Sequence, residues 1–177
     1  MEKDVIFQTH RLELRYFREG DFGPLFSYRS DPDVARFQCY ESMTGSEVKR
    51  MIGDYKSRIY GAPGEWTQYA IASKSTGRLA GDCAVFKDEL PGVVEIGVTI
   101  NPAYQRRGIA GEALRSLIAW LSVNHNVHLV TAVTDRGNTA YRALLSSLLF
   151  RETQETISHA WKNKSPEELV LYKLHIA

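Results

Sequence analysis

The chain has 177 residues, 44% of them hydrophobic and 24% charged, which is ordinary for one globular domain, so we expect a single domain over residues 1–177. Lysine and arginine number 22 against 21 aspartates and glutamates, which gives a formal net charge of +1. We expect neither nucleic acid nor an anionic membrane as a partner, because both bind proteins through a concentrated positive field.

The first third of the chain predicts one strand and then short helices. Residues 6–17 alternate apolar and charged side chains, which indicates a strand with one wet face. Asp21 is a candidate cap for a short helix, which the Ser-Asp-Pro-Asp segment at 30–33 ends. Residues 46–47 open a longer helix, which we expect to end near the Gly/Pro cluster at 61–64.

Three strands follow in the middle of the chain. Residues 66–73 and 79–87 read as strands joined by a loop at 74–78 that contains a glycine. A turn at 88–92 leads to a third strand at 93–100, where apolar residues alternate with Glu, Gly and Thr. Because both connections are short, the three strands should be antiparallel.

The last part of the chain predicts two helices and three strands. Beyond Gly108 an apolar stripe recurs at helical spacing, at Leu114, Leu117, Ile118 and Leu121. A β-branched strand at 127–134 and a helix at 138–147 follow, and then a final pair of strands at 150–160 and 168–176.

These elements predict a mixed α/β fold. The sheet should have about seven strands, mostly antiparallel, flanked by about four helices. The strands at 93–100 and 127–134 are linked by a helix, so we expect one parallel crossover between them.

A basic loop between strand and helix is the strongest chemical signal in the chain. It reads Gln105-Arg106-Arg107-Gly108-Ile109-Ala110. A helix N-terminus presents unpaired backbone N–H groups and a positive dipole end, and glycine lets the backbone approach an anion closely. No Gly-Lys-Ser/Thr follows and no G-x-G-x-x-G occurs, so we expect neither an NTP nor a dinucleotide.

At these residues the sequence resembles the GCN5-related N-acetyltransferase (GNAT) superfamily, whose acetyl-CoA loop is written Q/R-x-x-G-x-G/A. The flanking Glu95-Ile96-Gly97, Pro102 and Glu112-Ala113 resemble its Rim-type subgroup, which acetylates ribosomal-protein N-termini and small amines. The resemblance implies the GNAT fold and a direct transfer of acetyl from acetyl-CoA, as co-substrate, to a primary amine. A non-catalytic acyl-CoA-binding or regulatory module on the same fold is the alternative.

The resemblance also assigns site residues. It implies that acetyl-CoA contacts Val98, Ile100, Gln105, Arg106, Arg107, Gly108, Ile109, Ala110 and Asn138. It implies that Glu95 acts through water as the base, which is needed because an amine of pKa about 10 is protonated at pH 7. Glu95 could instead be a solvated strand residue, and Asn138 could serve only as a helix N-cap.

The chain departs from the family after Asn138. Tyr141 stands where the family usually has a Ser, Leu145 where a Tyr is frequent, and Leu148-Leu149-Phe150 where Leu-Gly-Phe is usual. Tyr141 shares an aliphatic helix stripe, so it points inward. It is a candidate general acid for the CoA thiolate, and packing is the commoner fate of such an aromatic.

Four aromatic residues are candidates for the acceptor pocket: Phe37, Tyr40, Trp66 and Tyr69. Core packing is the commoner role for each. The five histidines form no ligand set, so we expect no metal.

Two cysteines, Cys39 and Cys83, lack C-x-x-C spacing, and no secretory h-region or membrane-spanning apolar run is present. We therefore expect free thiols in a cytoplasmic protein. Its oligomeric state is open between monomer and homodimer.

Overall fold

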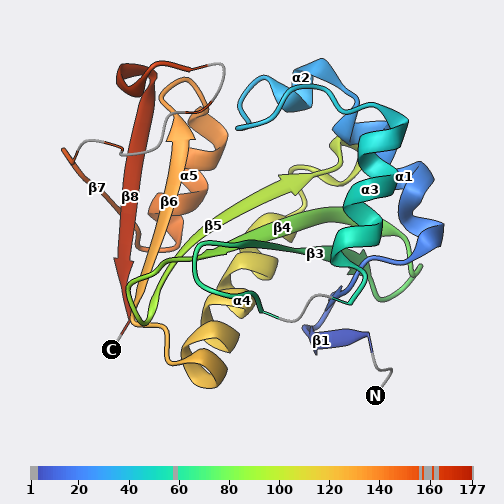
Figure 1. The fold of residues 1–177 in the computed structure, drawn as a ribbon, viewed down its shortest axis with the longest axis horizontal. Helices are drawn as coiled ribbons and strands as arrows, with labels where there is room; N and C mark the ends of the chain where they lie inside the picture. The colour runs from blue at the N-terminus through green and yellow to red at the C-terminus, as the bar shows by residue number, and fades with distance from the viewer. Residues whose placement is uncertain (1–3, 58–59, 156, 158–160, 162–163, 177) are drawn as a thin grey trace.

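A computed structural model describes residues 4–57, 60–155, 157, 161 and 164–176. The described residues form one sheet of eight strands. Figure 1 shows helices on both sides of this sheet. The strands are β1 (Val5–Gln8), β2 (Leu12–Arg15), β3 (Trp66–Ser73), β4 (Leu79–Lys87), β5 (Val93–Ile100), β6 (Leu129–Asp135), β7 (Arg151–Glu152) and β8 (Leu169–His175). The α-helices are α1 (Phe22–Arg29), α2 (Pro32–Ala35), α3 (Gly45–Tyr55), α4 (Ile109–His125) and α5 (Thr139–Ser147).

The strand order is β1-β2-β3-β4-β5-β6-β8-β7, and every pair is antiparallel except β5 with β6. The predicted mixed α/β fold with one parallel crossover is therefore confirmed, as are the bounds of β3, β4 and β5. The described part of the chain has one more strand and one more α-helix than expected, because residues 6–17 divide into two strands and α2 is a separate turn.

The single strand predicted over residues 6–17 is wrong, because the segment is a hairpin. β1 and β2 pair with each other, and Thr9 closes the turn between them. The Thr9 hydroxyl accepts from Leu12 N at 2.9 Å, and Thr9 N donates to Leu12 O, also at 2.9 Å. A threonine side chain that bonds the local backbone favours a turn over a continued strand.

The start of α3 and the cap of α1 differ from expectation. α3 begins at Gly45 because Thr44 and Glu47 form a capping box, in which Thr44 N donates to the Glu47 carboxylate at 2.7 Å. The helix ends at Tyr55, before the predicted cluster at 61–64. α1 begins directly after Asp21, as predicted, but the Asp21 carboxylate makes no cap bond to α1. It accepts from Arg18 N at 2.8 Å and pairs with buried Arg15 at 2.7 Å.

The C-terminal strands are shorter than predicted. β6 starts at Leu129, and β8 covers Leu169–His175, inserted between β6 and β7. β7 has only two residues, and no strand covers residues 153–155. The rest of the predicted strand at 150–160 lies largely outside the described residues.

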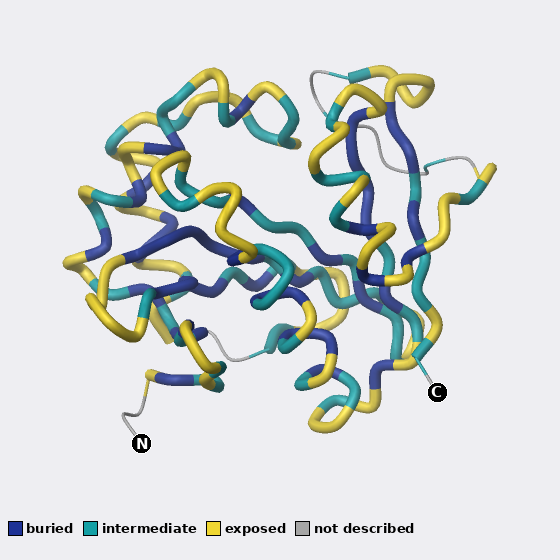
Figure 2. The backbone as a smooth tube through the Cα atoms, turned by 180° about the vertical axis from the view of Figure 1, so that it is seen from behind, coloured by how far each residue is buried: buried dark blue, intermediate teal, exposed yellow. Residues whose placement is uncertain are grey.

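Two hydrophobic clusters lie on opposite faces of the sheet. α4 and α5 pack on one face with residues such as Leu117, Leu145 and Ile71. α1 and α3 pack on the other face, where Leu25 and Val48 meet Ala70. Ile71 and Ala70 are neighbours on β3 with side chains on opposite faces, as strand geometry requires. Figure 2 shows the buried backbone running through the middle strands.

Candidate active site

β5 and β6 part soon after they begin. They pair only where Val93–Glu95 face Leu129–Thr131, and in Figure 1 they diverge from that point. The β6-side edge of β5 beyond Glu95 therefore has no strand partner among the residues that the structure describes. Tyr141 of α5 reaches into the gap, and its hydroxyl donates to Ile96 O at 3.4 Å.

The basic loop follows directly at the end of β5. The Gln105 side chain donates to Ile100 O at 3.0 Å and so fixes the loop to the strand. Gly108 has φ +74°, a left-handed conformation that suits glycine, and it precedes the first turn of α4. The first intrahelical bond runs from Glu112 N to Gly108 O, so the N–H groups of residues 109–111 have no acceptor within the helix.

Thr9 and Arg11 of the β1–β2 turn hold this loop through hydrogen bonds to Glu112 and Arg107, which together we call the tether. The Arg11 guanidinium donates to Glu112 at 2.6 Å and to Arg107 O at 2.9 Å. Glu112 also accepts from Arg11 N at 3.0 Å and from the Thr9 hydroxyl. Partial burial opposes ionisation of Glu112, but the bonds from Thr9 and Arg11 outweigh it and lower its pKa. Glu112 thus joins the β1–β2 turn to the first turn of α4.

The loop opens onto a cleft of about 540 Å³, which we call the loop cleft. Its lining includes eight of the nine residues predicted to bind acetyl-CoA: Val98, Ile100, Gln105, Arg106, Gly108, Ile109, Ala110 and Asn138. Arg107 is the exception. It lines a separate hollow with Arg11 and Lys74, on the side of the hairpin.

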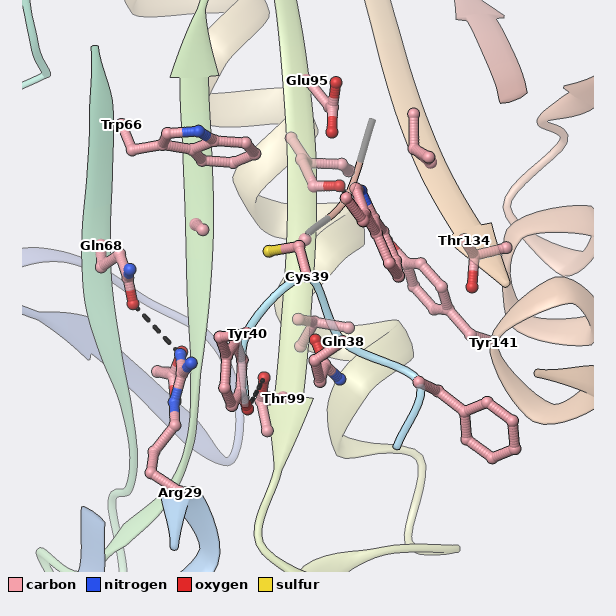
Figure 3. A pocket seen from close by; sticks show the side chains of 18 of the residues that line it. Arg29, Gln38, Cys39, Tyr40, Trp66, Gln68, Glu95, Thr99, Thr134 and Tyr141 are labelled. Atoms are coloured by element: carbon pink, nitrogen blue, oxygen red, sulfur yellow. Dashed lines mark hydrogen bonds and ion pairs between the residues drawn. The ribbon is translucent and has the colours of Figure 1, made fainter. Parts of the chain in front are cut away.

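A second hollow of about 360 Å³, the Glu95 cavity, lies beside the loop cleft and is drawn in Figure 3. Glu95 lines it together with three of the four predicted acceptor-pocket aromatics, Phe37, Tyr40 and Trp66. The two hollows share Phe37, Gln38, Val98, Thr99, Asn138 and Tyr141. They therefore meet where β5 and β6 diverge.

The structure does not place Tyr69 in this cavity. Tyr69 is fully buried on the α4 face of β3, with its ring 6.4 Å from that of Trp120. Trp66 and Tyr69 are three residues apart on one strand, and side chains at odd spacing point to opposite faces. The prediction that both line one pocket was therefore wrong for Tyr69.

An ion pair that sequence patterns did not indicate forms one wall of the Glu95 cavity. Arg29 and Asp82 are 3% and 1% exposed and are paired through Arg29 Nη2. Asp82 also accepts from the Tyr28 hydroxyl at 2.6 Å, and Arg29 donates to Gln68 at 3.1 Å. The guanidinium lies 4.2 Å from the centre of the Tyr40 ring. Burial opposes ionisation of Arg29, but the charge of Asp82 raises the pKa of Arg29 on balance, so the guanidinium stays protonated.

Tyr141 stands at the junction of the two hollows with a strongly perturbed hydroxyl. Burial first, and then the charge of Glu95, raise its pKa. Nearby in Figure 3 is Thr134, 1% exposed, whose hydroxyl has no hydrogen-bond partner among the described residues. Asn138 does cap α5, because its side chain accepts from Tyr141 N at 3.2 Å. This cap fixes the first turn of the helix that carries Tyr141.

Both cysteines are free thiols, as predicted. Cys83 is buried in the core, whereas Cys39 lines the Glu95 cavity. Cys39 is nevertheless an exposed residue, on the open side of this cavity.

In the described ranges, no helix combines the length and apolarity needed to cross a bilayer. The same ranges contain no group of three or more His, Cys, Asp or Glu side chains placed to hold a metal ion.

Comparison with known proteins assigns a family to this site. Residues 11–151 match the family described as Acetyltransferase (GNAT) domain. The chain is 28% identical over 149 residues to the uncharacterized N-acetyltransferase p20 of Bacillus licheniformis, with 81% of each chain covered.

Two solved structures have similar folds. The spermidine N-acetyltransferase of Vibrio cholerae, in complex with CoA and spermine, has a TM-score of 0.76 at 14% identity, over 94% of this chain and 96% of that one. RimL, a ribosomal L7/L12 alpha-N-protein acetyltransferase in complex with coenzyme A, has a TM-score of 0.77 at 14% identity, over 98% of both chains. Because the family match covers most of its length, the chain belongs to the GNAT family and is an acetyl-CoA-dependent acetyltransferase.

Proposed function

We propose that this protein transfers acetyl directly from acetyl-CoA in the loop cleft to a primary amine in the Glu95 cavity. The observation that carries the proposal is that the two hollows meet at Val98 and Tyr141, where β5 and β6 diverge. Two substrates that approach from opposite sides would bring their reacting atoms together there. Such positioning makes direct transfer efficient and needs no covalent enzyme intermediate.

The loop cleft suits the phosphates and the arm of CoA. The N–H groups of residues 109–111 are open to an anion at the N-terminus of a 17-residue helix, and Arg106 adds a positive charge. The edge of β5 beyond Glu95 offers backbone groups to an extended pantetheine arm. In this binding mode the Val98 N–H is the candidate donor to the oxyanion.

Glu95 is the proposed base. Acetyl-CoA supplies a thioester that only a neutral amine attacks, so the ammonium must first lose a proton. Glu95 lies on the cavity face of β5 and would take that proton through a water molecule.

Tyr141 is the proposed acid. As the C–S bond breaks, its hydroxyl would give a proton to the departing thiolate sulfur and then regain one from solvent. The hydroxyl carries its proton at neutral pH, and its 3.4 Å bond to Ile96 O is weak enough to break. Burial raises its pKa, which makes it a weaker acid than an ordinary phenol.

We also propose that the chain acts as one domain over residues 1–177 and that it is of the Rim type, with a protein N-terminus or a small amine as acceptor. The Rim-type assignment is supported by the fold similarity to RimL and by the loop with its flanking residues.

A non-catalytic CoA-binding module is the competing function. It predicts CoA affinity without turnover.

The test is Glu95→Gln, followed by thiol release from acetyl-CoA with an amine acceptor between pH 7 and pH 10. We expect turnover to fall by about 10²-fold at pH 7 and by less at pH 10, where more of the amine is already neutral. A deficit that is equal at every pH would argue against a base. A wild-type protein that binds CoA but releases no thiol with any amine would favour the binding module.

A further inference from the structure

We propose that the Arg29 end of the Glu95 cavity is a carboxylate subsite and that the acceptor is an amino acid, a small molecule that carries a carboxylate as well as the amine. This inference rests on the proposed function, since it concerns the acceptor of that same site. Of the acceptors left open above, it selects a small amine over a protein N-terminus. The argument comes from the hydrogen-bond donors that line this end of the cavity.

The first observation is that the Arg29 guanidinium has a nitrogen to spare. Nε donates to Asp82 at 3.2 Å, and Nη2 donates to Asp82 and, at 3.1 Å, to Gln68 Oε1. Nη1 makes no hydrogen bond or ion pair with any residue that the structure describes, and it is not one of their fully enclosed polar atoms. Nη1 therefore keeps accessible surface on a side chain that is otherwise buried in the cavity wall. Guanidinium N–H groups bind carboxylates through strong charge-assisted bonds.

The second observation is a neighbouring donor on Gln68. A guanidinium has no acceptor atom, so the Gln68 amide must turn its Oε1 toward Arg29, and its NH₂ group becomes the other end. That NH₂ group has no partner within the described part of the chain and is not enclosed either. Figure 3 shows the Gln68 amide and the Arg29 guanidinium side by side at the cavity wall. Together they offer two adjacent donors, which suits the two oxygens of a carboxylate.

The guanidinium is held in place before any ligand binds. Asp82 accepts from the Tyr28 hydroxyl at 2.6 Å, and the Tyr40 ring lies 4.2 Å from the guanidinium. Because Asp82 occupies the Nε and Nη2 side, the hydrogens of Nη1 point away from its carboxylate. A donor fixed in this way binds an anion without the cost of ordering a flexible side chain.

The other polar groups near Arg29 do not oppose an anion. Gln38 and Thr99 also line the cavity, and their amide and hydroxyl groups can donate as well as accept. Asp82 pairs across the sheet with Thr99, which is four residues beyond Glu95 on β5. Four strand residues span about 13 Å, so the charge of Glu95 is distant from this end.

The subsite is close to the proposed point of transfer and has room for a ligand. Thr99 is the residue after Val98, where the two hollows meet, so one small molecule can reach both. Between them, the cavity lining includes the small residues Ala84 and Gly97, which pair across the sheet. A Cβ added at Gly97 would meet no atom within 4 Å. The cavity of about 360 Å³ therefore has space for an amino acid above these residues.

The experiment compares acceptors that share one body and differ in one group. Phenylalanine is compared with phenylalaninamide and 2-phenylethylamine, and 4-aminobutyrate with butylamine, which covers a longer spacing between amine and carboxylate. Values of kcat/KM are referred to the neutral fraction of each amine, because their pKa values differ. We expect at least one of the two amino acids to exceed its uncharged counterparts by tenfold or more. A smaller preference in both series would overturn the inference.

A matched pair of variants tests the subsite without breaking the buried ion pair. Gln68→Glu keeps an oxygen for Arg29 but replaces the NH₂ group by a second carboxylate oxygen. Gln68→Met removes the donor and adds no charge. The ratio of amino acid to simple amine activity should fall by roughly tenfold or more in Gln68→Glu, because like charges repel at close range, and by less in Gln68→Met. An unchanged ratio in Gln68→Glu would refute the subsite.

Binding separates this inference from the proposed function. Calorimetric titration of the CoA-saturated protein with phenylalanine and 2-phenylethylamine, and with 4-aminobutyrate and butylamine, needs no turnover. Tighter binding of an amino acid than of its amine, with no acetyl transfer to any amine, would support the subsite and refute the proposed function. Acetyl transfer to amines with no preference for a carboxylate would refute the subsite and leave the proposed function standing.

Discussion

Replacing Tyr141 by Phe tests the proposed acid, because it deletes one hydroxyl and keeps the ring. The lost hydrogen bond to Ile96 O is 3.4 Å long, so its removal should cost less than about 0.5 kcal/mol of folding free energy. For a chain of this size that is a change in Tm of about 2 °C or less. The variant should therefore be folded, and its activity can be interpreted.

The expected loss of activity is much larger. Burial and Glu95 raise the pKa of Tyr141, so the hydroxyl is protonated throughout an assay from pH 6 to about pH 9, and the same shift makes it a weaker donor than an ordinary phenol. Loss of a general acid lowers turnover by about 10²-fold or more, which is about 2.7 kcal/mol in the activation barrier. The affinity for CoA, measured by calorimetric titration, should change little.

Tyr40→Phe is the matched control. Its hydroxyl lines the same cavity and has a hydrogen bond of the same length, 3.4 Å, to Thr99. This variant should lose much less activity than Tyr141→Phe. If Tyr141→Phe turns over within about threefold of wild type, the 10²-fold expectation for acid catalysis fails, Tyr141 is a packing residue and solvent protonates the thiolate.

Three further variants test the loop, the tether and a strained residue. Gly108→Ala places a side chain at φ +74°, with its Cβ 3.4 Å from Arg11 Nη2. Urea unfolding should show that the variant is less stable by about 1–2 kcal/mol, and calorimetric titration should show a weaker affinity for CoA. Unchanged stability and affinity would show that this glycine is not part of the site. Glu112→Gln should be less stable than wild type at neutral pH. Because the pKa of Glu112 is lowered from 4.5 on folding, its ionised form stabilises the protein above that value, and the difference between variant and wild type should shrink as the pH falls through the lowered pKa. A difference independent of pH would contradict this reasoning. Leu149 has φ +69° and a side chain that is 77% exposed, so Leu149→Gly should remove backbone strain. Urea unfolding should show a gain in stability of about 0.5–1 kcal/mol. A lower stability would show that the Leu149 side chain makes stabilising contacts.

Local patterns were sufficient for the centre of the fold. The bounds of β3, β4 and β5 follow from period-2 alternation and short glycine-containing connections. The start of α4 follows from Gly108, whose positive φ marks a helix entry that few other residues adopt. The loop cleft could be predicted for the same reason, because seven of the eight predicted residues that line it lie within one strand–loop–helix unit, and only Asn138 lies elsewhere in the sequence.

Misplaced boundaries came from side chains that bond their own backbone. Thr9 closes the β1–β2 turn, and Thr44 with Glu47 starts α3. The second pattern, Thr-x-x-Glu, is visible in the sequence and places the N-cap at Thr44, one turn position earlier than a helix opened by Ser46 and Glu47. Periodicity of apolar residues carries no information about such local bonds.

The walls of the Glu95 cavity depend on tertiary contacts that no local pattern reveals. Arg29 and Asp82 are 53 positions apart in the sequence. From the sequence alone, each would be interpreted as a charged residue on the solvated surface. Tyr69 packs in the core, on the face of the sheet opposite Trp66, as strand alternation applied to the two residues together requires.

β6 lies in the middle of the sheet but depends on the end of the chain. It pairs with β5 over three residues only, whereas β8 pairs with all seven residues from Leu129 to Asp135. Until β8 is synthesised, a nascent chain would therefore expose β6 with one edge fully open and the other paired only at Leu129–Thr131, a state prone to wrong pairing. The groove beside β6 would form late in folding, after the hairpins of β1–β5. Loss of β8 would then abolish the site without removing any residue from it.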